Sequence, residues 1–169
     1  MVNEYNARAA RQGFSPTQMS ATHGDLLGRE KPSPSVSGPD FYDFDLAVVD
    51  LGFHHFEDPA LAAKRLVERL KPGKGVLLIV DFVRHAHGKH GGAHAAAHHG
   101  GGEDGEKLMG AAAHTIAHHG FAREEIEGML RGAGCVDVEY VVLEEPLRLG
   151  DEMEGQERTA FMIRGRRQG

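Results

Sequence analysis

Two short apolar runs constrain this chain more than any other feature. Leu46-Ala47-Val48-Val49 lies inside the segment 44–51, and a second run fills 76–80. Each run is too short for a buried helix or a membrane span and has the length of a strand covered on both faces. The sequence therefore predicts two neighbouring strands of an α/β sheet, at 44–51 and at 76–80.

The segment between these runs predicts a helix. Asp58 is a good N-cap, and Pro59 suits the first helical position. Apolar side chains then recur at helical spacing, which gives the helix one buried stripe: Ala62, Ala63, Leu66, Val67 and Leu70. Lys71-Pro72-Gly73 predicts the end of the helix. Strand, helix and strand with short links indicate a right-handed parallel crossover.

Ligands of open α/β sheets bind beyond the carboxyl ends of the parallel strands. Here these ends are the segments 50–55 and 81–84. We therefore expect the functional site at these two segments. Asp81 is expected to be structural or to line a cleft rather than to react.

The flanking segments carry weaker patterns. A helix is predicted at 2–12 and another at 124–131, where Ile126, Met129 and Leu130 share a buried side. Residues 19–23 give a weak strand signal. Alternation of Val136, Val138, Tyr140 and Val142 predicts a strand at 136–143, and 159–163 reads as the last strand. These two strands should pair antiparallel as a hairpin with a long loop.

The chain has twelve histidines and 23 glycines, and six of the histidines and seven of the glycines lie in the segment 85–105. This low-complexity composition predicts a flexible His/Gly-rich insertion within one domain that covers 1–169. His94 with His98, and His114 with His118, are spaced four apart and would share a helix face. Since no cysteine and few acids accompany them, we expect adventitious metal binding at most and predict no functional metal site.

Charge and cysteine usage exclude several classes of protein. The formal net charge is −6 with no basic stripe, which argues against nucleic acid as a partner. The single cysteine, Cys135, excludes an internal disulfide and a multi-cysteine zinc site. No apolar run approaches the roughly 20 residues of a membrane span. We expect a soluble, cytoplasmic protein that does not act at a membrane.

Several motifs together resemble the class I S-adenosylmethionine-dependent methyltransferases, of the kind called methyltransferase type 11 or 12. The segment 44–59, FDLAVVDLGFHHFEDP, resembles their fourth strand, the following "hH" loop and the next helix start. The segment 66–73, LVERLKPG, resembles their "rvLkPGG" turn, with Lys74 replacing the second glycine. The segments 76–81 and 135–165 are similar to the fifth strand and to the C-terminal tail.

The resemblance implies S-adenosylmethionine as cofactor and a set of residues that bind it. The segment 19–27 resembles the third strand and its "gDl" turn, so Asp25 would bind the adenine amino group and Leu26 would flank the ring. Leu51, Gly52 and His54 would line the cofactor cleft. The alternative for Asp25 is an ordinary solvated turn acid.

Histidines supply the candidates for catalysis and for substrate contact. His54 or His55 could remove a proton from a substrate hydroxyl or amine, since imidazole titrates near neutrality. The alternative is that one packs against the cofactor and the other covers the helix start. In the family the region around His118 and His119 covers the active site, so either could touch substrate.

Two family features have no counterpart in the sequence: the Gly-rich loop after the first strand and the ribose-binding acid after the second. The helix at 2–12 resembles the one that follows the second strand. We therefore expect an incomplete, N-terminally truncated Rossmann-like sheet with the third to seventh strands and without the first two. In the family order 3-2-1-4-5-7-6, the fourth strand then becomes an exposed edge that a protein partner could cover.

Three functional hypotheses follow from these patterns. The first is methyl transfer from S-adenosylmethionine to a small molecule, by an active chain or by one that has lost activity. The second is a non-catalytic partner or remnant of a methyltransferase. The third is a histidine-rich metal-binding protein.

Overall fold

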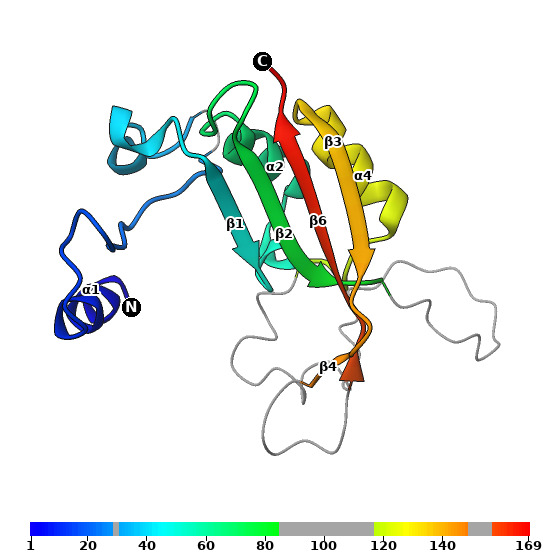
Figure 1. Cartoon of the computed structure of the whole chain (residues 1–169), viewed down its shortest axis with the longest axis horizontal. Coiled ribbons are helices and arrows are strands. Elements are labelled where there is room, and N and C mark those ends of the chain that lie inside the picture. The colour runs from blue at the N-terminus through cyan, green and yellow to red at the C-terminus, as the bar shows by residue number, and fades with distance from the viewer. Residues whose placement is uncertain (29–30, 85–116, 149–156) are drawn as a thin grey trace, which may run out of the picture.

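A four-stranded sheet forms the centre of the protein (Figure 1). The computed structural model describes residues 1–28, 31–84, 117–148 and 157–169. The strands lie in the order β1-β2-β6-β3, and a separate two-stranded ribbon pairs β4 with β5. The bounds are β1 Leu46–Asp50, β2 Val76–Phe82, β3 Cys135–Val142, β4 Leu147–Arg148, β5 Glu157–Arg158 and β6 Ala160–Arg167.

The predicted parallel crossover is confirmed. β1 and β2 pair in parallel, with Leu46 beside Val76 and Asp50 beside Val80. Helix α2 (Pro59–Val67) connects them, and the backbone N–H of Leu61 donates to Asp58 Oδ1 at 2.9 Å. Asp58 is therefore the N-cap that the sequence predicts. The first strand is shorter than expected, since outside β1 Phe44 makes only an isolated bridge to Leu70.

The predicted C-terminal hairpin is also confirmed, with one irregularity. β6 lies antiparallel between β2 and β3. The register of β3 shifts between Val136 and Glu139, and Asp137 has a positive φ of 52°. This β-bulge changes which side chains face inward, so Cys135 joins the core in place of Val136. Strict alternation from Val136 is therefore wrong at this point.

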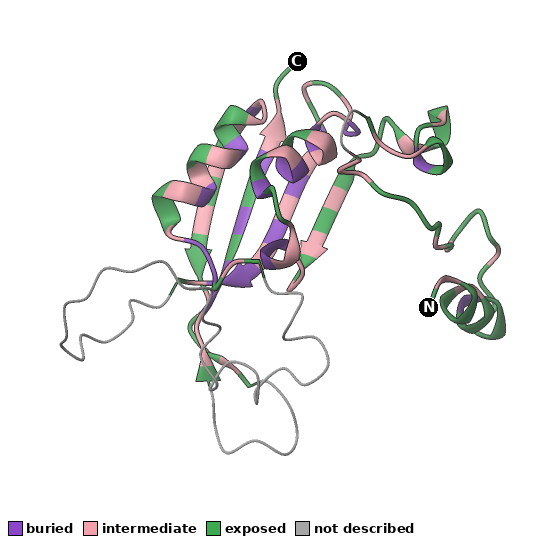
Figure 2. Ribbon diagram, turned by 180° about the vertical axis from the view of Figure 1, so that it is seen from behind, coloured by how far each residue is buried: buried purple, intermediate pink, exposed green. Residues whose placement is uncertain are grey.

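Both crossover helices cover the same face of the sheet (Figure 2). α2 packs beside α4 (Arg123–Gly132). Ile126 and Leu130 of α4 are fully buried, as their spacing predicts. The core between helices and sheet also includes these fully buried side chains: Phe53, Ala63, Leu70, Leu77, Ile79, Phe121, Phe161 and Ile163.

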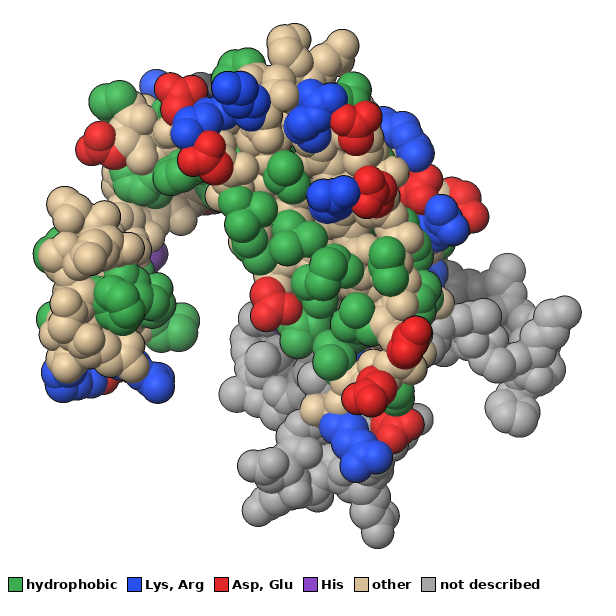
Figure 3. All heavy atoms as spheres, viewed as in Figure 1, with side chains coloured by type: hydrophobic (Ala, Val, Ile, Leu, Met, Phe, Trp, Pro, Cys, Tyr) green, Lys and Arg blue, Asp and Glu red, His purple; other side chains and the backbone are tan. Residues whose placement is uncertain are grey.

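The opposite face of the sheet has no helix over it in the described part of the chain, and apolar side chains gather on it (Figure 3). Strand registers place Val48 beside Leu78, and Val80 beside Met162, which lies beside Val141. Val48 is 51% exposed and Val141 is 59% exposed. A sheet in this fold class is normally covered on both faces, so this surface is unusual for a monomer.

The N-terminal segment departs from the sequence prediction. The helix α1 (Val2–Arg11) forms as expected. Residues 19–23 form no strand, so that prediction is wrong. A strand needs a neighbour whose backbone completes its ladder, and no described strand lies beside this segment.

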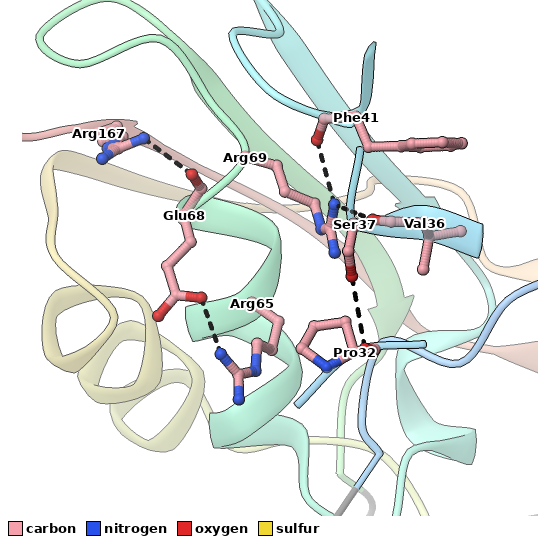
Figure 4. A network of polar contacts seen from close by, with 8 residues as sticks. All are labelled: Pro32, Val36, Ser37, Phe41, Arg65, Glu68, Arg69 and Arg167. Carbon is pink, nitrogen blue, oxygen red and sulfur yellow. Dashed lines mark hydrogen bonds and ion pairs between the residues drawn. The ribbon is translucent and has the colours of Figure 1, made fainter. Parts of the chain in front are cut away.

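The rest of the segment is attached to the sheet domain by a buried arginine (Figure 4). Two short 3₁₀ helices, η1 (Pro34–Val36) and η2 (Pro39–Phe41), lie close to the end of α2. Arg69 Nη1 donates to the carbonyl of Val36 at 2.7 Å and to that of Phe41 at 3.1 Å. Its guanidinium also lies 5.0 Å from the centre of the Tyr42 ring.

None of the helices in the described part of the chain has the length and hydrophobicity that a membrane-spanning helix needs.

Candidate active site

The chain turns sharply where β1 ends. The N–H of Leu51 donates to the carbonyl of Val80 at 2.9 Å, which continues the β1–β2 pairing by one bond. Leu51 then adopts a positive φ of 49°, which is uncommon for a bulky residue and is often found at functional sites. Gly52 follows and leads into the 3₁₀ helix η3 (Phe53–His55). The turn brings η3 against the carboxyl end of β2.

At this point His54 and Asp81 form a buried pair. His54 is 2% exposed and Asp81 is fully buried. Nδ1 of His54 lies 2.7 Å from Oδ1 of Asp81. The sequence patterns predict a role for each residue separately and do not predict their contact. The available signal was their position, since both follow or end neighbouring parallel strands at the same edge of the sheet.

Asp81 is held by backbone groups as well as by the imidazole. Its Oδ2 accepts from the N–H of His54 at 2.9 Å, and its Oδ1 also accepts from the N–H of Phe82 at 2.7 Å. Since these two oxygens accept from fixed N–H donors, the carboxylate has no rotational freedom. An ionised carboxylate only accepts hydrogen bonds, so Nδ1 of His54 must carry the proton in this contact.

The segment after residue 116 forms one wall of the site. Ala117 and His118 donate their N–H groups to the carbonyl of His54 at 3.1 and 3.0 Å. Phe121 donates to the carbonyl of Phe82 at 3.0 Å. Gly120, with φ of 98°, approaches so closely that a Cβ there would lie 2.6 Å from the Phe82 oxygen. His118 therefore lies beside His54, and the substrate contact of His118 and His119 stays a prediction.

Two ring nitrogens at this site are buried and have no hydrogen-bond partner among the described residues. They are Nε2 of His54 and Nε2 of His118. A buried polar atom without a partner costs about 1–3 kcal/mol, so each such atom needs an explanation. The ring of His55 lies 4.2 Å from that of His54, centre to centre, tilted by 37°. His119 is exposed.

Asp25 and Leu26 lie in a turn of the N-terminal segment. Asp25 is exposed, and its Oδ1 accepts from the N–H of Leu27 at 2.8 Å. The N–H of Ser33 donates to the Asp25 carbonyl at 2.7 Å, which closes the turn. Such an Asx turn suits the solvated-acid alternative. The adenine role of Asp25 and Leu26 stays a prediction.

In the described ranges, no group of three or more His, Cys, Asp or Glu side chains could hold a metal ion. His94, His98 and His114 lie outside the described residues, as does the predicted insertion at 85–105. The expectation of adventitious metal binding there therefore stays a prediction.

Comparison with known proteins finds the same architecture in solved structures. No protein-family model and no curated protein matches the sequence. Solved structures do match the fold. The YcgJ protein of Bacillus subtilis is 15% identical, with a TM-score of 0.58 over all of this chain and 79% of its own. The N-methyltransferase NodS of Bradyrhizobium japonicum is 17% identical, with a TM-score of 0.54 over all of this chain and 70% of its own.

A third structure is PigF with SAH, which is 13% identical, with a TM-score of 0.56 over 98% of this chain and 40% of its own. The chain spans 61% and 32% of the length of two further methyltransferases that it resembles. The strand order β1-β2-β6-β3 matches the order 4-5-7-6 in this family. The sequence motifs give the same correspondence. The described part of this chain therefore has the fold of the class I S-adenosylmethionine-dependent methyltransferases.

Proposed function

We propose that this protein transfers a methyl group from S-adenosylmethionine to a small molecule at the carboxyl ends of β1 and β2. The observation that carries the proposal is the turn at Leu51 and Gly52, which sets the buried His54–Asp81 pair at the edge where open α/β sheets bind their ligands. The methyltransferase fold of the solved relatives supports the same reaction.

The residues at this edge fit such a cofactor. Gly52 leaves its backbone open, since a Cβ there would meet nothing closer than 3.7 Å. In the turn of the N-terminal segment, apart from the residues that end β1 and β2, Asp25 offers an exposed carboxylate that can accept from an exocyclic amine. The bound cofactor would supply a methyl group made electrophilic by its sulfonium. Leu51, Gly52 and His54 would position the cofactor, and Asp25 with Leu26 would hold its adenine.

Calorimetric titration of the full chain with S-adenosylmethionine tests the proposal. We expect saturable binding that Gly52→Val weakens by filling the open backbone. Asp25→Asn should weaken it by about tenfold, since one hydrogen bond to a charged group contributes about 1.5–3 kcal/mol. Glu4→Gln is the matched control, because Glu4 is an exposed acid on α1 that pairs with Arg11 on the same helix. Absence of binding by the unmodified chain would contradict the proposal.

A second candidate is a non-catalytic subunit that pairs with a complete methyltransferase. Within the described residues, one face of the sheet has no helix over it and β1 is an edge strand. Both features favour this candidate, because further strands and helices would bury them. Purification of a stoichiometric second chain, together with no binding of S-adenosylmethionine by this chain alone, would support this candidate over the first.

The metal-binding alternative rests on the segment 85–105. Deletion of 85–105 without a change in the metal content of the purified protein would remove that alternative.

A further inference from the structure

We propose that Asp81 is a positioning residue that fixes the tautomer of His54, so that Nε2 of His54 accepts the proton of the methyl acceptor. The proposal rests on the proposed function and deepens it. It assigns the acceptor to one chemical class: molecules whose nucleophilic atom carries a proton that must leave, such as hydroxyls.

The tautomer follows from the contacts of Asp81. Its two oxygens accept from the N–H groups of His54 and Phe82, which only donate. An ionised carboxylate only accepts hydrogen bonds, so with Asp81 ionised the imidazole donates to it through Nδ1, at 2.7 Å. In the neutral ring this leaves the lone pair on Nε2. Nδ1–H held by a carboxylate and Nε2 left as acceptor is the arrangement that prepares a histidine to act as a base.

The second observation is the unsatisfied Nε2 itself. This atom is buried and has no partner among the described residues, and the same is true of Nε2 of His118. The two residues are joined by the bond from the N–H of His118 to the carbonyl of His54. A ligand that donates a hydrogen bond at this place would supply the missing partner. A ligand without such a donor would leave Nε2 of His54 without a partner, and the free-energy cost of burying that atom would remain.

Among the described residues, three titratable groups lie next to His54. They are Asp81 of β2, His55 of η3 and His118 of the segment that begins at residue 117. Asp81 supplies the negative charge that stabilises an imidazolium once the proton arrives. In the transfer step, the acceptor oxygen forms its bond to the methyl carbon as the methyl–sulfur bond breaks. The proton of the acceptor moves to Nε2 of His54, and the sulfonium becomes a neutral thioether.

Nitrogen-15 spectra of the histidine side chains in the full chain test the tautomer without any acceptor. A His54→Gln variant identifies the signals of His54. We expect the Nδ1–H form in the unmodified chain and its loss in Asp81→Leu. Asp81→Asn is the second variant, since it keeps the size of the side chain if the leucine disturbs folding. Asp58→Ala is the control, because it also removes a carboxylate that accepts from a backbone N–H but lies on α2. An Nε2–H form in the unmodified chain would overturn the proposal.

The second arm measures transfer from labelled S-adenosylmethionine to two probes, phenol and N,N-dimethylaniline. Phenol must lose a proton, whereas the tertiary amine has none to lose. We expect Asp81→Asn and His54→Gln to lower kcat for phenol by about 10²-fold, the usual contribution of a general base, and to leave transfer to the amine unchanged. An equal loss for both probes would show a merely structural role and overturn the proposal. Absence of cofactor binding would instead contradict the proposed function, while the tautomer result would still stand.

Discussion

The side-chain amide of Asn6 pairs with both backbone polar groups of Ala21. Asn6 Nδ2 donates to the carbonyl of Ala21 at 3.0 Å, and the N–H of Ala21 donates to Asn6 Oδ1 at 2.7 Å. The two hydrogen bonds resemble those that a neighbouring strand would make with Ala21, and they connect α1 to the segment 19–23. A single side chain thus satisfies one residue of a segment that the sequence predicts as a strand.

Asn6→Ala should release this segment. The variant leaves the N–H and carbonyl of Ala21 to solvent and removes two hydrogen bonds, each worth about 1 kcal/mol net. We expect faster amide hydrogen exchange in residues 19–23 with little change in the sheet. Asn3→Ala on the same helix is the control, since Asn3 is exposed. Equal exchange in both variants would show that the Asn6 contact does not hold the segment.

Arg69 should matter more for stability than the exposed arginines. It is 6% exposed, and its hydrogen bonds to Val36 and Phe41 join the N-terminal segment to the sheet domain. We expect Arg69→Met to lower the free energy of unfolding by about 2–3 kcal/mol, because hydrogen bonds to a charged donor are lost and two carbonyls lose their partner.

Arg131→Met provides the control for Arg69. Arg131 is paired with Glu127 on the surface of α4, and exposed pairs contribute about 0–1 kcal/mol. Urea unfolding followed by circular dichroism measures both variants. A loss for Arg69→Met no larger than that for Arg131→Met would contradict the role of Arg69.

The uncovered face of the sheet should make the isolated chain self-associate. We expect poor stability alone and an unfolding midpoint that rises with protein concentration, since association buries the apolar face and the β1 edge. Val48→Lys should reduce association, because it places a charge on this face at the edge strand β1. Phe14→Ser is the control, as Phe14 is 44% exposed but lies in the N-terminal segment. Cooperative unfolding that is independent of concentration would refute the prediction.

Cys135 should be an unreactive thiol. Burial raises its pKa from the usual 9.0 to about 11, and the residue is 4% exposed. We expect negligible alkylation by iodoacetamide at pH 8 and fast alkylation after unfolding in urea, since the thiolate is the reactive form. Rapid labelling of the folded chain at pH 8 would show that the thiol is accessible.

The same shift gives a pH dependence with a definite sign. Below pH 9 the thiol is protonated in both the folded and the unfolded state. Between pH 9 and about 11 it ionises only when unfolded, so its contribution to stability is lost as the pH rises through this window. Replacement by Ala should remove this part of the alkaline destabilisation, measured by thermal unfolding across the window.

Elements with local signals could be predicted from the amino-acid sequence. The Asp58 cap, the apolar stripe of α2 and the runs in β1 and β2 each depend on neighbours along the chain, and all are confirmed. The alternation of apolar residues and the long connecting loop predict that β3 and β6 pair antiparallel. The structure confirms this pairing. From these elements the order of the sheet follows the family that the motifs resemble.

Three other features depend on contacts between distant parts of the chain, and the sequence did not predict them. The bulge at Asp137 reverses the facing of Cys135 and Val136, and no sequence period encodes it. The segment 19–23 is not a strand, because strand formation depends on a neighbour supplied from elsewhere. The contact between His54 and Asp81 joins residues 27 positions apart, since it requires the register of two strands and the turn at Leu51. Local pattern fixes which segments form strands, whereas the hydrogen bonds that define a site depend on where those strands end in space.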